Sequence, residues 1–201
     1  MDLFEVRRKI FHMIGGALIL IGVLSGYVTQ WILVGCIVII LLSSFIIKMY
    51  PNKLFSFILM LFERQKNIEK FPLRGMFFFF LGCTVPLFVF SFPVAVLSIV
   101  ILTIGDAASA LVGKYFGRTK HPLHTSKMIE GHIAGGLLAF GAATAMNYAF
   151  VYGLPWWNLL ITSMATMFIE GIEHIGSHEW VDDNLTIPLI AGVIMEGLRL
   201  I

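Results

Sequence analysis

Apolar residues gather along this chain into runs of roughly 20 residues, separated by short polar or charged segments. A helix of that length crosses the hydrocarbon core of a bilayer, which is about 30 Å thick. The runs predict an all-α, polytopic membrane protein with about seven transmembrane helices. Their expected limits are 10–28, 30–48, 74–91, 94–114, 131–152, 155–174 and 184–200.

One further apolar segment, 54–62, is too short to cross a bilayer, and Lys53 and Arg64 flank it. This pattern predicts a short helix that lies at the membrane surface or re-enters from it. No internal repeat or low-complexity linker divides the chain, so we expect one integral-membrane domain over residues 1–201.

The composition agrees with a membrane protein, since 58% of the residues are hydrophobic and 13% are charged. If the N-terminus lies in the cytosol, every Lys and Arg except Arg199 falls on the cytosolic side, as the positive-inside rule expects. The net charge of +2 is too small to indicate binding to nucleic acid. The compact length favours the cell membrane of a prokaryote, with the polar segments facing the cytosol.

The most polar of these segments, 105–131, begins with Gly105 and Asp106. Asp106 follows twelve uncharged residues, so we expect it deep in the fourth helix or at a break made by Gly105. An acid at membrane depth costs about 2.5–3.5 kcal/mol on insertion scales. One interpretation is an Asp that pairs with a basic residue for packing. A functional acid that faces a cavity is favoured, because ionisable residues inside membranes usually serve a pathway or a site.

Glycines and basic residues follow, including Gly113, Lys114 and Gly117. Backbone N–H groups and cations at a helix end are able to surround phosphates, although the positive-inside rule alone also explains basic residues here. The sequence has no Gly-x4-Gly-Lys-Ser/Thr motif, which argues against a P-loop nucleotide site.

The same segment ends with Ser126, Lys127, Glu130 and Gly131. Lys127 and Glu130 share one face if the segment is helical. Glu130 suits the cap of the fifth helix, which explains that residue without a site. Lys127 stands at the unfavourable end of the helix dipole, so we expect an anion beside it.

Arg8, Lys9 and His12 precede or enter the first helix, with Arg8 and His12 four positions apart on one face. The two basic residues are equally explained as a topology anchor, whereas His12 lies beyond the anchor and within the span. Near the end of the sixth run a set of acids and histidines shares one helical face: Glu170, Glu173, His174 and His178. They suit either direct binding of Zn or Fe or, as we favour, one or two acids facing a cavity.

Asp182, Asp183 and Asn184 stand immediately before the last run. Adjacent carboxylates and an amide suit Mg²⁺, a hard cation that takes oxygen ligands. Alternatively, Asp183 or Asn184 merely caps the last helix, which does not exclude cation binding by its neighbours.

Three ordered patches together resemble the CTP-dependent polyprenol kinase family, which includes dolichol, phytol and CTP-dependent diacylglycerol kinases. They are Arg8-Lys9-x-x-His12, the segment from Gly105-Asp106 to Lys127-x-x-Glu130-Gly131, and Asp182-Asp183-Asn184-Leu185-Thr186-Ile187-Pro188. The resemblance implies a membrane kinase that moves the γ-phosphate of CTP to the hydroxyl of a lipid alcohol, with Mg²⁺ or another divalent cation. Eukaryotic dolichol kinases are much longer, and this chain resembles their C-terminal catalytic part.

On that basis we expect a single cytosolic site, and each candidate residue has an expected role. The candidate catalytic residues are His12, Asp106, Lys127, Glu130 and Asp183. The candidate nucleotide-binding residues are Arg8, Lys9, Gly105, Gly113, Lys114, Gly117, Ser126, Lys127, Gly131 and Asn184. The candidate metal ligands are Asp106, Glu170, Asp182 and Asp183.

Two other classes of function stay open on the sequence. A cytidylyltransferase that acts on a lipid phosphate also needs CTP, Mg²⁺ and paired acids. A small-solute transporter is disfavoured, because the charged residues cluster toward one face and the opposite side is nearly uncharged. The lipid alcohol itself (dolichol, a shorter polyprenol, geranylgeraniol, phytol or diacylglycerol) is not distinguished by any residue pattern.

Overall fold

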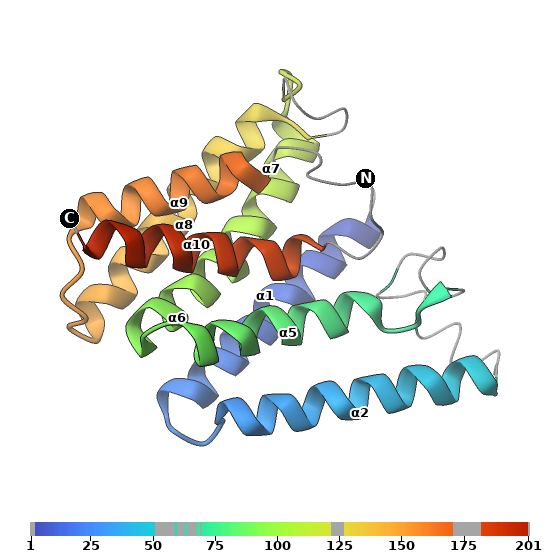
Figure 1. The fold of residues 1–201 in the computed structure, drawn as a ribbon. Coiled ribbons are helices and arrows are strands. Elements are labelled where there is room, and N and C mark those ends of the chain that lie inside the picture. Colours follow the sequence, from blue (N-terminus) through green and yellow to red (C-terminus); the bar gives the residue numbers. More distant parts are fainter. Residues whose placement is uncertain are drawn as a thin grey trace.

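The computed structural model describes residues 3–50, 59, 63, 68, 70–121, 127–170 and 182–200, and this part of the chain is almost entirely helical (Figure 1). The elements are α1 (Leu3–Leu24), α2 (Gln30–Met49), α5 (Arg74–Val89), α6 (Phe92–Val100), η1 (Ile101–Asp106), α7 (Ala107–Phe116), α8 (Ile129–Ala149), α9 (Trp156–Glu170) and α10 (Asp183–Arg199). The α6, η1 and α7 elements form one continuous helix, Phe92–Phe116. The all-α prediction is confirmed for the described residues.

Each of the seven predicted apolar runs coincides with one helix, and most boundaries agree within a few residues. The largest difference is α1, which begins at Leu3 and not near residue 10. Glu5 in its first turn accepts two hydrogen bonds from Arg8, at 3.1 and 2.8 Å. An acid near a helix start and an i,i+3 ion pair both favour the helix, so the basic residues lie within it.

The continuous helix formed by α6, η1 and α7 lies at the centre of the bundle (Figure 1). Its side chains Leu97, Ile99 and Leu102 are fully buried. The η1 segment is a π-helix, which widens the turn that ends at Asp106. Asp106 therefore stands within an unbroken helix, and the expected break at Gly105 does not occur.

Helix α8 crosses α7 and η1 at glycines. A Cβ atom at Gly131 would stand 2.5 Å from the main-chain oxygen of Ser109, and one at Gly135 would stand 2.7 Å from that of Gly105. Both distances are shorter than real Cβ contacts allow, so only glycine permits this approach. The close crossing brings the start of α8 against the helix that carries Asp106.

Two helices of the described chain are long and apolar enough to cross a bilayer, namely Gln30–Met49 and Phe92–Phe116. The number of seven spans therefore stays a prediction. The apolar segment 54–62 lies outside the described residues except for Leu59, which is buried. Large apolar side chains are exposed along the outer faces of α1 and α2, including Leu18, Ile39 and Phe45.

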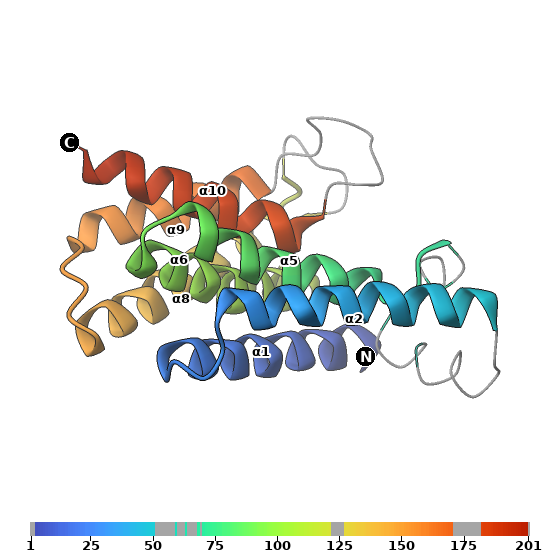
Figure 2. The same ribbon diagram turned by 60° about the horizontal axis from the view of Figure 1, so that its bottom comes forward.

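Figure 2 shows that the helix ends fall into two groups. The turns that join α1 to α2, α5 to α6 and α8 to α9 lie at one end of the bundle, together with the C-terminus. The start of α1, the end of α2 and the starts of α5 and α10 lie toward the other end. This second end carries the predicted polar patches.

Candidate functional site

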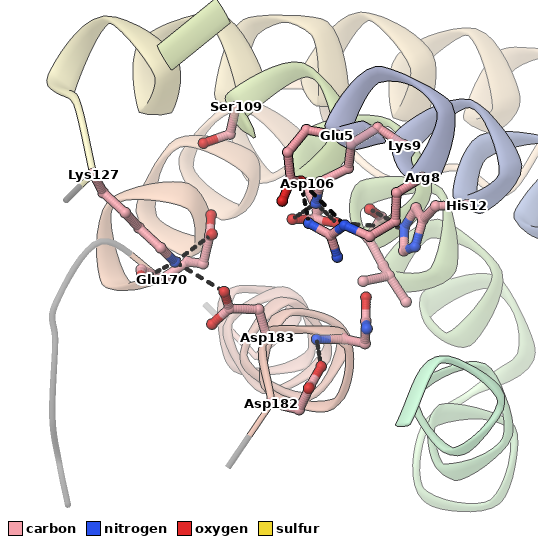
Figure 3. Close-up of polar contacts among 12 residues, drawn as sticks. Glu5, Arg8, Lys9, His12, Asp106, Ser109, Lys127, Glu170, Asp182 and Asp183 are labelled. Carbon is pink, nitrogen blue, oxygen red and sulfur yellow. Dashed lines mark hydrogen bonds and ion pairs between the residues drawn. The ribbon is translucent and has the colours of Figure 1, made fainter. Parts of the chain in front are cut away.

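The first polar cluster joins the N-terminal patch to the central helix. Lys9 Nζ donates to both carboxylate oxygens of Asp106, at 2.7 and 2.6 Å. Only 5% of the Lys9 side chain and 7% of the Asp106 side chain are exposed. Because neither charge is hydrated, each depends on the other for compensation. The two patches thus meet in one buried ion pair, which Figure 3 shows.

His12 lies beside this pair, with its Nε2 atom 3.6 Å from Asp106 Oδ2. The same Nε2 atom is 3.4 Å from the main-chain oxygen of Leu102, in η1. A carbonyl oxygen only accepts hydrogen bonds, so this contact assigns the proton to Nε2. The ring packs on Phe79, with 4.5 Å between centroids. These contacts hold the His12 ring between η1 and Phe79.

The second polar cluster joins the loop before α8 to the end of α9 and the start of α10. Lys127 Nζ donates to Glu170 Oε1 at 2.6 Å, to the Glu170 main-chain oxygen at 3.0 Å and to Asp183 Oδ2 at 3.0 Å (Figure 3). Burial opposes the charged form, but Glu170 and Asp183 outweigh it and raise the pKa of Lys127 above its ordinary value. Two protein carboxylates therefore stand beside Lys127, and binding of a ligand anion there stays a prediction.

The start of α10 differs from the expected capping. Asp182 is the N-cap and accepts from the main-chain nitrogen of Asn184 at 3.1 Å, so neither Asp183 nor Asn184 is the cap. Asp182 also lies 3.9 Å from Arg74 at the start of α5. This cap orients the first turn of α10 and leaves the side chain of Asp183 to contact Lys127.

The two clusters lie within electrostatic reach of one another. Burial raises the pKa of the Asp182 carboxyl, and the negative charges of Asp183 and Asp106 act in the same direction. The hydrogen bond from Asn184 and the charge of Arg74 oppose these effects. Helix α10 also packs against η1, the segment that ends at Asp106.

Sequence reasoning missed a third set of polar residues, in which His132 is central. Its Nδ1 atom is 3.4 Å from Ser109 Oγ and 3.9 Å from Glu170 Oε2. His132 is 1% exposed, and Ser109 stands one turn beyond Asp106. The sequence feature that could have identified His132 is its place early in an apolar run, because ionisable residues inside membrane helices usually have a role.

The other predicted site residues have separate positions. Gly105, Gly113 and Gly131 lie at the crossing of α8 with η1 and α7, which gives them a packing role. Gly117 ends α7 and contacts Met128, while Lys114 is exposed on α7. Their binding of nucleotide stays a prediction.

Glu130 does not cap α8 as expected. Its carboxylate accepts from the main-chain nitrogen of Thr119 at 2.9 and 3.2 Å, which ties the loop after α7 to the start of α8. Ser126 lies outside the described residues, as do Glu173, His174 and His178.

The four predicted metal ligands are divided between the two clusters and the start of α10, and their binding of a metal stays a prediction. Among the described residues, no three His, Cys, Asp or Glu side chains form a group able to hold a metal ion. Asp106 has both oxygens bound by Lys9, whereas Glu170 Oε2 is buried and, among the described residues, has no hydrogen-bond partner. Glu170 and Asp183 share Lys127, so these two offer hard oxygen atoms close together.

No family model and no solved structure matches the chain. Curated relatives do match it. CTP-dependent diacylglycerol kinase 1 of Eremothecium gossypii is 27% identical over 217 residues, which cover 96% of this chain and 67% of that protein. Probable phytol kinase 2 of Oryza sativa is 32% identical, and farnesol kinase of Arabidopsis thaliana is 31% identical. Each of these two alignments covers 51% of this chain and 35% of the relative.

The diacylglycerol kinase alignment covers nearly the whole chain. The two plant kinases match about half of the chain. Diacylglycerol and phytol kinases are members of the family that the three patches resemble, and farnesol kinase is a further relative. The comparisons therefore confirm that this chain is related to the CTP-dependent polyprenol kinase family.

Proposed function

We propose that this protein is a membrane kinase that transfers the γ-phosphate of CTP to the hydroxyl of a lipid alcohol. The observation that carries the proposal is the meeting of three sequence patches through two ion-pair clusters. Lys9 of the first patch binds Asp106 of the second, and Lys127 of the second binds Asp183 of the third. The curated relatives, which are named as CTP-dependent diacylglycerol, phytol and farnesol kinases, support the same reaction.

The triphosphate would lie between the two clusters, with Lys127 and the N-terminal basic residues toward its oxygens. Arg8 suits this role because its side chain is one third exposed, although Glu5 holds it in this structure. Phosphoryl transfer requires little covalent chemistry from the protein. Positioning of the reactants and neutralisation of the γ-phosphoryl charge dominate the rate.

Mg²⁺ or a similar cation fits part of the predicted ligand set. Glu170 and Asp183 would hold it, with phosphate oxygens and water completing its coordination. Such a cation, when bound, neutralises charge on the transferred phosphoryl group. Asp106 suits this role less well, because both of its oxygens already accept from Lys9.

For the proton of the acceptor hydroxyl, the contacts favour Asp183 over Asp106. Both oxygens of Asp106 already accept from the Lys9 ammonium, so this carboxylate is engaged within the protein. Asp183 binds Lys127 through one oxygen and is half exposed. His12 is disfavoured because its Nε2 proton faces the Leu102 carbonyl.

We further propose that the helices cross the membrane with the N-terminus and the polar end of the bundle toward the cytosol. The exposed apolar faces of α1 and α2 support contact with lipid, and the lipid alcohol would keep its tail in the bilayer. The relatives are eukaryotic proteins, so they lend no support to the prokaryotic source expected from the compact length.

One experiment tests the reaction and the acceptor together. The purified protein, reconstituted in vesicles, receives CTP labelled at either the α- or the γ-phosphate, with Mg²⁺ and one of diacylglycerol, phytol, farnesol or a long polyprenol. The proposal expects label in the lipid from γ-labelled CTP alone. Label from the α-position would instead identify a cytidylyltransferase. Absence of lipid labelling for every acceptor would contradict the kinase proposal.

A further inference from the structure

Lys127 is already surrounded by protein oxygens before any nucleotide is considered. An ammonium has three N–H donors, and three oxygens in the described part of the chain accept from Lys127: two belong to Glu170 and one to Asp183. A phosphate oxygen that binds Lys127 must therefore take the place of one of them.

The two acids that hold Lys127 differ in how firmly they are fixed. The Glu170 side chain is 4% exposed, whereas that of Asp183 is 52% exposed. Glu170 holds the ammonium by both its carboxylate and its main-chain oxygen. Asp183 holds it by one oxygen, from the first residue of α10.

The surroundings of Glu170 also keep it in place. His132 lies 3.9 Å from its second carboxylate oxygen, and Ser109 lies 3.4 Å from the same His132 nitrogen. All three side chains are buried, so movement of Glu170 would disturb packing as well as charge. Asp183 has water on one side and is able to rotate away from Lys127 without such a disturbance.

We propose that Lys127 exchanges Asp183 for a phosphate oxygen when CTP binds, while Glu170 keeps its hold as the positioning residue. The inference rests on the proposed function. It describes how Lys127 becomes available to the phosphates of the nucleotide. Asp183 accepts from Lys127 Nζ and so competes with a phosphate oxygen for this ammonium. Entry of the triphosphate releases the Asp183 carboxylate beside the phosphates, where the proposed reaction uses it.

The test is nucleotide binding without lipid acceptor and without divalent cations, so that neither turnover nor metal affinity contributes. The dissociation constants of CTP and of inorganic triphosphate are measured for wild type, Asp183→Asn and Glu170→Gln. Each substitution removes one negative charge that contacts the same ammonium, so general repulsion predicts equal tightening. Exchange predicts that Asp183→Asn binds about twofold to fivefold more tightly, as expected for loss of a half-exposed ion pair. It predicts that Glu170→Gln binds no more tightly than wild type.

A double variant makes the test independent of how well Glu170→Gln folds. Adding Asp183→Asn to Lys127→Gln should give no further tightening, because the competition acts through Lys127. Glu196→Gln, at the far end of α10, is the control and should leave the affinity unchanged.

Tightening that persists in the Lys127→Gln background would overturn the exchange, as would equal tightening by Glu170→Gln. Either result leaves the kinase proposal standing if wild type still transfers γ-label. A wild type that binds neither probe would overturn the exchange, and the labelling assay then decides the kinase proposal by itself.

Discussion

At the end of the bundle away from the candidate site, Arg199 donates to Ser91 Oγ at 2.8 Å and lies 3.4 Å from Glu196. Both charged side chains are over one third exposed, at 40% and 34%. At the site end, by contrast, the Lys9–Asp106 pair is almost completely buried. Exposed pairs typically contribute 0–1 kcal/mol, whereas a buried pair must first overcome desolvation. An exposed ion pair also links helices and has a smaller desolvation cost. The burial of Lys9 and Asp106 therefore indicates a function beyond linking helices.

The largest effect is expected from breaking the buried pair. Lys9→Met leaves the Asp106 carboxylate without its partner, so the free energy of unfolding should fall by about 3–5 kcal/mol and γ-phosphate transfer should be lost. Denaturation in detergent micelles and the labelling assay measure the two effects. The double variant Lys9→Met/Asp106→Leu should recover most of the stability but none of the activity. Recovered activity in that variant would show that the pair serves packing alone.

A smaller effect is expected from the second cluster. Lys127→Ala removes a charged hydrogen-bond donor from the proposed phosphate site, so the KM for CTP should rise about tenfold or more, or turnover should cease. Lys48→Ala is the matched control, because Lys48 donates to the main-chain oxygen of Lys70 and contacts neither cluster. An unchanged rate for Lys127→Ala at limiting CTP would show that Lys127 does not bind the nucleotide.

Substitution at the crossing of α8 with η1 should have a smaller effect than substitution in either ion-pair cluster. Gly135→Ala places a methyl group 2.7 Å from the Gly105 oxygen, so stability should fall by about 1–3 kcal/mol and activity should fall with it. Gly141→Ala, on the same helix, meets nothing within 4 Å and should stabilise the protein by up to about 1 kcal/mol. Thermal unfolding of both variants compares them. Equal changes in stability for Gly135→Ala and Gly141→Ala would mean that α8 is able to move away from η1.

The smallest effect is expected at the opposite end. Arg199→Gln should change the free energy of unfolding by less than about 1 kcal/mol, because its partners are exposed. The KM for CTP should stay at the wild-type value. A clear rise in this KM would show that the two ends of the bundle are coupled, and the comparison between them would then fail.

The sequence predicted the helices well because span-length apolar runs leave few alternatives for the backbone. It also led us to expect one site formed by the three patches, and ion pairs of Lys9 with Asp106 and of Lys127 with Asp183 join them. It did not predict the π-helical turn before Asp106, because no residue pattern in 101–106 marks such a turn.

The partners of Lys127 were equally hidden from the sequence. Glu170 lies 43 positions from Lys127, and only the packing of α8 against α9 brings them together. His132 was missed for a related reason. One histidine in an apolar run has no sequence neighbour to reveal its role, and its contacts with Ser109 and Glu170 exist only in the folded bundle.

The most direct test of the shared site is transfer of γ-label from CTP to a lipid alcohol by wild type, Asp106→Asn and Lys127→Ala in the same vesicles. Asp106→Asn and Lys127→Ala each change one of the two clusters. If both clusters serve one nucleotide, wild type labels the lipid and each variant fails when equal amounts of folded, purified protein are compared. Near-wild-type transfer by the purified Asp106→Asn variant, at limiting CTP, would contradict the account.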